Sequence, residues 1–261
     1  MTDLLLSSLQ RACDAFADQA GEISILVEGI SHSAAASIAP TTLMPAASVI
    51  KLAIACAAFE DDSVDLDLGV KLKDLDETFY CSILKAFSPP TALSLKELIG
   101  LMLIISDNPA TTAVLDHIEP ARVAQWMSAN GMTQSRFSAG FTDRDLSGRN
   151  RANVTTAQDC LTLLKQVYDP SRPFAEIRTF LANNLRNDRI PKRLPDNAVI
   201  MHKTGTLSGL VHDIAIVESP HVCYYFTVLA NALPDPHKFA FDLAIFSEQV
   251  YELMLASAPR Q

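Results

Sequence analysis

Ser48 and Lys51, three residues apart, are the first pair in the chain that could do chemistry together. On a helix this spacing puts both side chains on one face, about one turn apart. A lysine that is partly desolvated there can lose its proton and act as a base toward the serine hydroxyl. Ser82 and Lys85 repeat the spacing, which by itself is often accidental. Ser48 differs because the apolar segment 52–59 follows it and would bury its helix.

A second group, Ser106-Asp107-Asn108, comes directly after an apolar segment, residues 98–105. Ser94 and Glu97 form a capping box that predicts a helix over this segment. Taken alone, the group is typical of a turn followed by a helix N-cap, because Ser, Asp and Asn all favour those positions.

A third group, Lys203-Thr204-Gly205, lies in a segment that begins at Val199 and is predicted to be a strand. The lysine and threonine could hold a carboxylate, and the glycine would let a ligand approach the backbone closely. A kink in an edge strand is the simpler interpretation of this group alone.

The three groups together are the Ser-x-x-Lys, Ser-Asp-Asn and Lys-Thr-Gly motifs, in that order. By these motifs the sequence resembles the class A β-lactamase-like serine hydrolases over nearly its whole length. The resemblance includes the terminal α/β portion and the segment 212–217.

The resemblance implies a role for each residue of the first two motifs. Ser48 would attack a strained amide carbonyl, and Lys51 would help to remove its proton. Ser106 would pass a proton to the leaving nitrogen, and Asn108 would orient Lys51 and the substrate. No metal ion or organic cofactor is expected.

The third motif would bind the substrate. The resemblance implies that Lys203 and Thr204 hold its carboxylate, within a binding segment that continues through Gly205 and Thr206. The backbone amides of Ser48 and Thr206 would form an oxyanion hole, typically worth about 3 kcal/mol per donor.

The sequence departs from the class A pattern in the loop that should supply a glutamate to activate the deacylating water. Residues 121–175 contain no glutamate. Their carboxylates are Asp143, Asp145, Asp159 and Asp169. We expect Asp143 or Asp145 to activate the water, with help from Asn150 or Asn153. Asp159 lies in the first turn of a predicted helix, where stabilisation of the helix dipole is the expected role.

Four other side chains could contact a ligand but are expected to be packed instead. His202 and His212 flank the third motif on predicted strands. Trp126 and Met127 lie at helical spacing near Met132 and are expected in the core.

Three functions fit these motifs. The first is hydrolysis of a β-lactam through an acyl-enzyme on Ser48. The second is a D-Ala-D-Ala peptidase or a small esterase, and the third is a penicillin-recognising sensor that stays acylated. The missing glutamate favours the last two, whereas the intact Ser-Asp-Asn motif favours the first. The expected partner is therefore a small molecule, either a β-lactam or a D-amino-acid peptide or ester.

The elements that must position these residues can be predicted from periodicity. A helix over the first twenty residues precedes a strand at 23–27, and strands at 198–207, 211–218 and 222–230 precede a helix over 239–255. The middle of the chain is mainly helical in pattern. We expect an antiparallel sheet flanked by the N- and C-terminal helices, with an inserted helical domain. The predicted α/β domain combines residues 1–45 and 196–261, and the all-α domain is 46–195, with the site between them.

Length and charge limit the remaining possibilities. The 261 residues suffice for one large or two small domains, and the net charge of −9 argues against nucleic acid or an anionic membrane as partner. The longest apolar segments are far shorter than a membrane span. The N-terminus does not resemble a secretory signal, so we expect a cytoplasmic protein unless an export signal has been removed. The five scattered cysteines are expected to be buried thiols.

Overall fold

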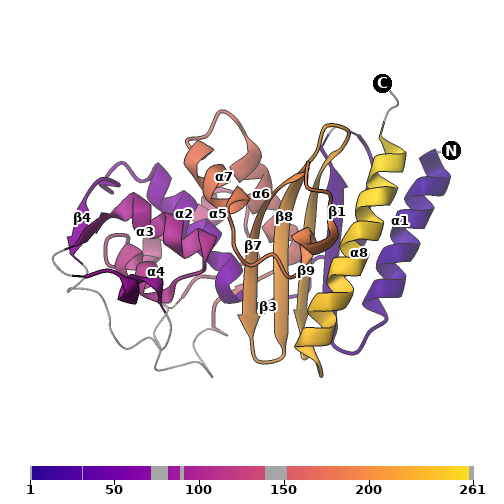
Figure 1. The fold of residues 1–261 in the computed structure, drawn as a ribbon, viewed down its shortest axis with the longest axis horizontal. Coiled ribbons are helices and arrows are strands. Elements are labelled where there is room, and N and C mark those ends of the chain that lie inside the picture. Colours follow the sequence, from indigo (N-terminus) through magenta and orange to yellow (C-terminus); the bar gives the residue numbers. More distant parts are fainter. Residues whose placement is uncertain (1, 31, 72–81, 89–90, 139–151, 259–261) are drawn as a thin grey trace.

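The computed structural model describes residues 2–30, 32–71, 82–88, 91–138 and 152–258, with the side chains of 2–5 excepted. A central antiparallel sheet lies between two groups of helices (Figure 1). The first and last helices of the chain cover one face of the sheet, and the helices from the middle of the chain lie on its other side.

The helices carry the labels of Figure 1. The α-helices are α1 (Thr2–Ala17), α2 (Lys51–Glu60), α3 (Leu95–Ile104), α4 (Asn108–Leu115), α5 (Pro120–Ala129), α6 (Ala157–Tyr168), α7 (Ala175–Ala182) and α8 (Pro236–Ser257). Short 3-10 helices are η1 (Ala47–Ile50), η3 (Ile83–Ala86) and η6 (Ile190–Arg193).

Five strands form the main sheet, in the order β2-β1-β9-β8-β7. They are β1 (Glu22–Gly29), β2 (Ala35–Ile38), β7 (Val199–Leu207), β8 (Leu210–Glu218) and β9 (Cys223–Asn231). Two further pairs of short strands lie outside it: β3 (Met44–Pro45) with β6 (Val154–Thr155), and β4 (Gly69–Lys71) with β5 (Ala92–Ser94). β7, β8 and β9 are consecutive antiparallel strands, as predicted.

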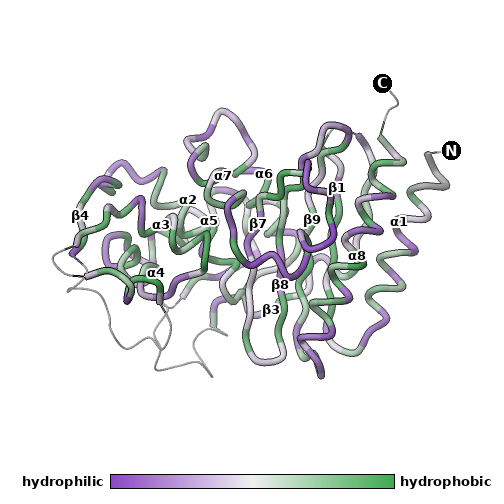
Figure 2. The backbone as a smooth tube through the Cα atoms, in the orientation of Figure 1, coloured by the Kyte–Doolittle hydropathy of each residue, from purple (hydrophilic) through white to green (hydrophobic). Residues whose placement is uncertain are grey.

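Each face of the main sheet contributes to a separate hydrophobic core. In β8, Ala215 and Val217 face the core that α1 and α8 cover, whereas Ile214 and Ile216 face the core shared with α2, α3 and α6. Because successive side chains point to opposite faces, a strand buried on both sides has an almost continuous apolar sequence. Figure 2 shows hydrophobic residues along the central strands and hydrophilic segments toward the periphery.

α1 and α8 pack against each other as well as against the sheet. The rings of Phe16 and Phe246 stack with their centroids 4.2 Å apart, and Phe16 also contacts Phe239. Leu9 and Ala12, predicted on the same face as Phe16, are buried with it. The two ends of the chain thus close one face of the sheet together.

The predicted fold class, an antiparallel sheet flanked by terminal helices with a helical insertion, is confirmed. The segment 46–195 is not purely helical, because it contains β4, β5 and β6. The domain boundaries at 45/46 and 195/196 stay a prediction.

Candidate active site

Ser48 lies on η1, which continues directly into α2. Ala47 before it has a φ of 46°, a left-handed conformation that costs a non-glycine residue roughly 1–2 kcal/mol. Ala47, Val49 and Ile50 are buried, whereas Ser48 is half-buried. Ser48 is therefore the residue of this turn that reaches the surface. The strained backbone conformation is that of Ala47, the residue directly before it.

Gly205 lets β7 pack closely against this turn. A Cβ atom at position 205 would lie 3.1 Å from the Ala47 Cβ atom and 3.3 Å from a methyl carbon of Val49. These contacts are tighter than a packed interface normally allows, so a side chain would push η1 from the strand. Ser48 directly follows Ala47, and Thr206 directly follows Gly205. That the backbone amides of Ser48 and Thr206 form an oxyanion hole stays a prediction.

Lys51 is completely buried, and it connects the first motif to the second. Its Nζ atom lies 2.7 Å from the carbonyl oxygen of Ser106, 2.6 Å from Oδ1 of Asn108 and 3.3 Å from Oγ of Ser106. Burial, with the nearby Lys203 cation, lowers the pKa of Lys51 well below its ordinary value, and Asp107 opposes this shift. The structure thus brings Lys51, Ser106 and Asn108 into direct contact.

The middle residue of the second motif has a structural part. Asp107 Oδ1 accepts from the Ala110 amide at 2.9 Å and so caps α4. Asp107 Oδ2 accepts from Ser82 Oγ at 2.7 Å and from the Ile83 amide at 3.0 Å. Ser106 has a φ of 61°, so the chain turns sharply where α3 ends. Ser82, in the second Ser-x-x-Lys group, serves as the cap of η3.

Replacing Asp107 with alanine is expected to lower the free energy of unfolding by about 1–3 kcal/mol, because α4 loses its cap and two partly buried donors lose their acceptor. Urea denaturation measures the change. Asp116→Ala, at the opposite end of α4, is the control. Removing that negative charge from the C-terminus of the helix should be neutral or slightly stabilising. Equal losses in both variants would contradict the role of Asp107.

Lys203 lies on β7 and is also completely buried. Its Nζ atom donates to the carbonyl oxygen of Thr204 at 3.0 Å. Burial lowers the pKa of Lys203 to about 7, the Arg186 cation adds to the shift, and Asp213 opposes it. β7 is an edge strand, so one side of it is not paired with another strand of the sheet. Thr204 is buried beside Lys203, and Thr206 is exposed.

Arg189 was not identified from the sequence, and its side chain forms hydrogen bonds with the segment that contains the third motif. It is 4% exposed, and its Nη1 atom donates to the carbonyl oxygens of Gly205 at 2.9 Å and His212 at 2.5 Å. Its Nη2 atom donates to Thr206 Oγ1 at 2.5 Å. The polar run 186–189 before the strand was the available signal, but such a run is equally typical of a surface loop.

His202 is buried beside Lys203, as expected for a packed histidine. Its Nδ1 atom lies 2.9 Å from Oδ1 of Asp213, and its Nε2 atom lies 3.0 Å from Oδ1 of Asn187. Asp213 also accepts from the Ile190 amide. This cluster fixes the segment before β7 to the strands β7 and β8.

His212 is held in one tautomer by two backbone groups. Its Nδ1 atom accepts from the Ala230 amide at 3.1 Å, so its Nε2 atom carries the proton and donates to the carbonyl oxygen of Pro45 at 2.8 Å. Burial is the main cause that lowers the pKa of His212 to about 4. The neutral ring therefore ties the sheet to the segment that leads into Ser48.

Protonation of His212 is expected to destabilise the fold in acid. The unfolded chain takes up this proton near pH 6.5 and the folded chain near pH 4, so the free energy of unfolding falls as pH decreases through this range. The full loss is about 3 kcal/mol. His212→Gln should reduce the slope between pH 6.5 and 4 in denaturation curves, whereas His237→Gln, at an exposed position, should leave it unchanged. An unaltered slope in His212→Gln would refute this account.

Three of the residues expected to activate the deacylating water, Asp143, Asp145 and Asn150, lie outside the described residues. Asn153 is described and buried, its Oδ1 atom accepts from the Ser138 amide at 2.9 Å, and its carbonyl oxygen accepts from the Ala46 amide at 2.7 Å. Asn153 thus anchors the end of this loop next to the turn that carries Ser48.

Asp159 has a structural role beyond the expected stabilisation of the helix dipole. It lies in the first turn of α6 and is buried. One carboxylate oxygen accepts from the amides of Gln134 and Ser135 and from the Ser135 hydroxyl. Asp159 therefore fixes the segment 134–135 to α6.

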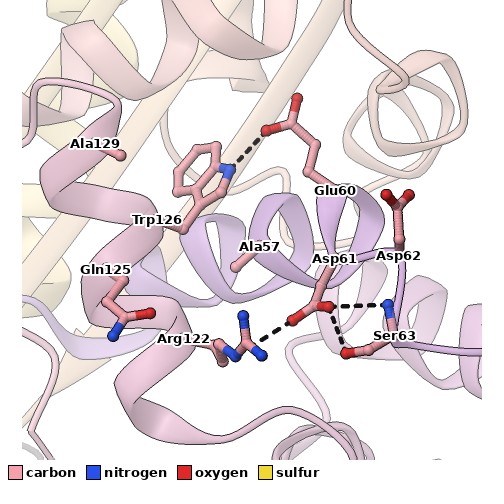
Figure 3. A pocket seen from close by; sticks show the side chains of 9 residues that line it. All are labelled: Ala57, Glu60, Asp61, Asp62, Ser63, Arg122, Gln125, Trp126 and Ala129. Atoms are coloured by element: carbon pink, nitrogen blue, oxygen red, sulfur yellow. Dashed lines mark hydrogen bonds and ion pairs between the residues drawn. The ribbon is translucent and has the colours of Figure 1, made fainter.

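Met127 and Trp126 lie on α5 but differ in burial. Met127 is in the core, as predicted. Trp126 is half-buried, and its indole donates to Glu60 at 2.8 Å (Figure 3). It lines an open pocket of about 520 Å³ at the end of α2 together with three acidic residues, Glu60, Asp61 and Asp62. This pocket contains none of the residues of the three motifs.

Three findings concern the part of the chain that the structure describes. No group of three or more His, Cys, Asp or Glu side chains there is arranged to hold a metal ion. No helix of that part is both long and apolar enough to cross a bilayer. The thiols of Cys13, Cys56 and Cys160 are free and buried, and that of Cys223 is free and half-buried.

Comparison with known proteins agrees with this geometry. The chain is 24% identical to the beta-lactamase regulatory protein BlaB of Streptomyces cacaoi, over 75% of this chain and 79% of that protein. It superimposes on a class A beta-lactamase from Bacteroides cellulosilyticus with a TM-score of 0.84 and 20% identity, covering 98% and 99% of the two chains.

A further similar structure is PBP-A, with a TM-score of 0.79 and 21% identity over 95% of this chain and 96% of that one. A leucine-to-glutamate variant of PBP-A has been solved as an acyl-enzyme complex with penicillin G. The profile of the beta-lactamase enzyme family matches residues 7–251, which is most of the sequence. The chain therefore belongs to the beta-lactamase enzyme family.

Proposed function

We propose that the protein opens β-lactams through an acyl-enzyme on Ser48 and releases the product by hydrolysis. The observation that carries this proposal is the environment of Lys51, a buried amine held between Ser106 and Asn108 one turn after Ser48. A neutral amine has two N–H bonds and one lone pair. Two contacts of Nζ are to oxygens that can accept those N–H bonds, and in this proposal the lone pair takes up the hydroxyl proton.

In the proposed acylation, the Ser48 hydroxyl transfers its proton to Lys51 as Oγ bonds to the amide carbon. The C–N bond of the substrate then breaks, and Ser106 donates its proton to the leaving nitrogen. Lys51 returns the proton to Ser106, whose Oγ atom lies 3.3 Å from Nζ. The lysine thus ends neutral, the proton lost by Ser48 is on Ser106, and the proton that Ser106 gave is on the product nitrogen.

The substrate is held from β7 in this proposal. Lys203 and Thr204 bind its carboxylate, and the amides of Ser48 and Thr206 stabilise the oxyanion. Arg189 acts as a positioning residue, because it fixes the carbonyl of Gly205 and the hydroxyl of Thr206.

A second candidate function is a slowly deacylating acceptor, either a sensor or a D-Ala-D-Ala peptidase. The absence of glutamate from residues 121–175 favours it, because aspartate is shorter and reaches a water less easily. The relative BlaB is named a regulatory protein, which is consistent with this candidate.

Intact-protein mass spectrometry with excess benzylpenicillin separates these candidates. We expect an adduct on the parent protein and none on Ser48→Ala. Consumption of many equivalents of ligand with little adduct remaining would support the β-lactamase. A single persistent adduct would instead support the acceptor.

Ser82→Ala is the matched control, since Ser82 begins the second Ser-x-x-Lys group but caps η3. It should still be acylated, and peptide mapping should locate the adduct on Ser48. A parent protein that neither forms an adduct nor consumes ligand, or an adduct that survives in Ser48→Ala, would overturn the proposal.

A further inference from the structure

Residues 184–189 form a strap that connects the second motif to the third. The Asn184 side chain donates to the carbonyl oxygens of Leu103 at 3.3 Å and His202 at 3.1 Å. The Leu185 amide donates to the carbonyl oxygen of Ile104 at 3.0 Å. The strap is therefore bonded to the end of α3, which leads into Ser106, and to β7 next to Lys203.

Arg186 is held at the centre of this strap. Its amide donates to Asn184 Oδ1 at 2.8 Å, and Asn187 on its other side contacts the His202 ring at 3.0 Å. Its backbone is thus fixed from both directions beside the junction of Ser106 and Lys203, while the Arg186 side chain is exposed.

Arg186 has no ion-pair partner among the residues that the structure describes. Among the described residues, no carboxylate lies within ion-pair distance of its guanidinium, whereas Arg189 is 3.8 Å from Asp188 and Arg193 is 2.6 Å from Glu248. Arg186 is close enough to lower the pKa values of Lys51 and Lys203. In a chain with a net charge of −9, cations are thus concentrated around one site.

We infer that Arg186 selects substrates whose leaving group bears a second acidic group in addition to the carboxylate held by Lys203. This inference rests on the proposed function. In the proposed function, Ser106 donates a proton to the leaving nitrogen, and Lys203 binds the first carboxylate. These two residues therefore define the side of the site that holds the leaving group. The strap places Arg186 beside that side. The fitting chemistry is a dicarboxylic D-amino acid as leaving group, or a bicyclic β-lactam with an anionic ring substituent.

The test uses two cephalosporins that share one acylamino side chain and differ only at the 3-position of the ring. One carries a neutral substituent and the other a carboxylate. The second-order rate of adduct formation on Ser48 is measured for each. In Arg186→Gln, the rate for the dianionic compound should fall roughly three- to five-fold relative to the rate for the monoanionic one. At about 1 M NaCl the difference should disappear.

Lys192→Gln is the charge-matched control, because Lys192 is exposed on η6, the turn that packs against α8. It should leave the ratio of the two rates as in the parent protein. If Arg186→Gln changes both rates equally, or neither, the inference is wrong while the proposed function stands. If the parent protein neither forms an adduct with either compound nor consumes it, the proposed function fails, and the inference fails with it.

Discussion

Replacing Lys51 with methionine is expected to slow acylation of Ser48 by benzylpenicillin by on the order of 10³-fold, the usual contribution of a positioned general base. Methionine occupies a similar volume but offers no lone pair of comparable basicity. It also leaves Ser106 without the group that returns its proton. Rapid-quench mass spectrometry of adduct formation measures the rate.

Lys85→Met is the matched control for this experiment, because Lys85 ends the second Ser-x-x-Lys group and is exposed. We expect its acylation rate to stay within about two-fold of the parent, as is usual for surface substitutions. Circular dichroism must show that Lys51→Met is folded, because the exchange leaves Ser106 O and Asn108 Oδ1 without the Lys51 donor. A folded Lys51→Met that acylates at the parent rate would exclude Lys51 as the base.

Replacing Lys203 with methionine is expected to lower the acylation efficiency for carboxylate-bearing β-lactams roughly 10- to 150-fold, the range of a hydrogen bond to a charged group. In the free protein the pKa of Lys203 is about 7, so its ammonium form is lost as pH rises through 7. The substrate carboxylate is ionised throughout this range. The efficiency of the parent should therefore fall above pH 7, and this fall should be absent in Lys203→Met.

A neutral ester of the same β-lactam is the control for Lys203. It lacks the charge that the ammonium group would bind, so its acylation should depend little on Lys203. Its rate should instead rise with pH, because deprotonation of Lys51 produces the base. An equal loss on the acid and on the ester would show that Lys203 supports the fold of the site instead of binding the carboxylate.

The features predicted from the sequence are those with strong local signals. The capping box at Ser94 is present with both of its hydrogen bonds. β8 and β9 were evident because strands buried on two faces leave long apolar runs. The three motifs identified the residues around Lys51 by type and order alone.

The features that the sequence did not reveal depend on contacts between distant segments. β3 and β6 are two residues long and pair Met44 with Thr155, so neither has a periodic pattern. The bonds from Arg189 to β7 and from Asp107 to Ser82 depend on tertiary structure. Nothing in the local sequence distinguishes a buried arginine of this kind from one in a solvated loop. The left-handed conformation of Ala47 also lacks a signal, since alanine disfavours it.

The position of β1 between β2 and β9 determines when the sheet can form during synthesis. The Thr227 hydroxyl in β9 bonds to the carbonyl of Leu26 in β1, a residue 201 positions earlier. At ~5–20 residues per second, a ribosome needs roughly 10–40 s to make the intervening chain. For that time β1, which carries Ile23, Ile25 and Val27 on one face, has no partner strand on the β9 side, and Ser48 lacks β7. The nascent chain therefore depends on delayed, long-range pairing, and the surroundings of its nucleophile are complete only after β7 has been made.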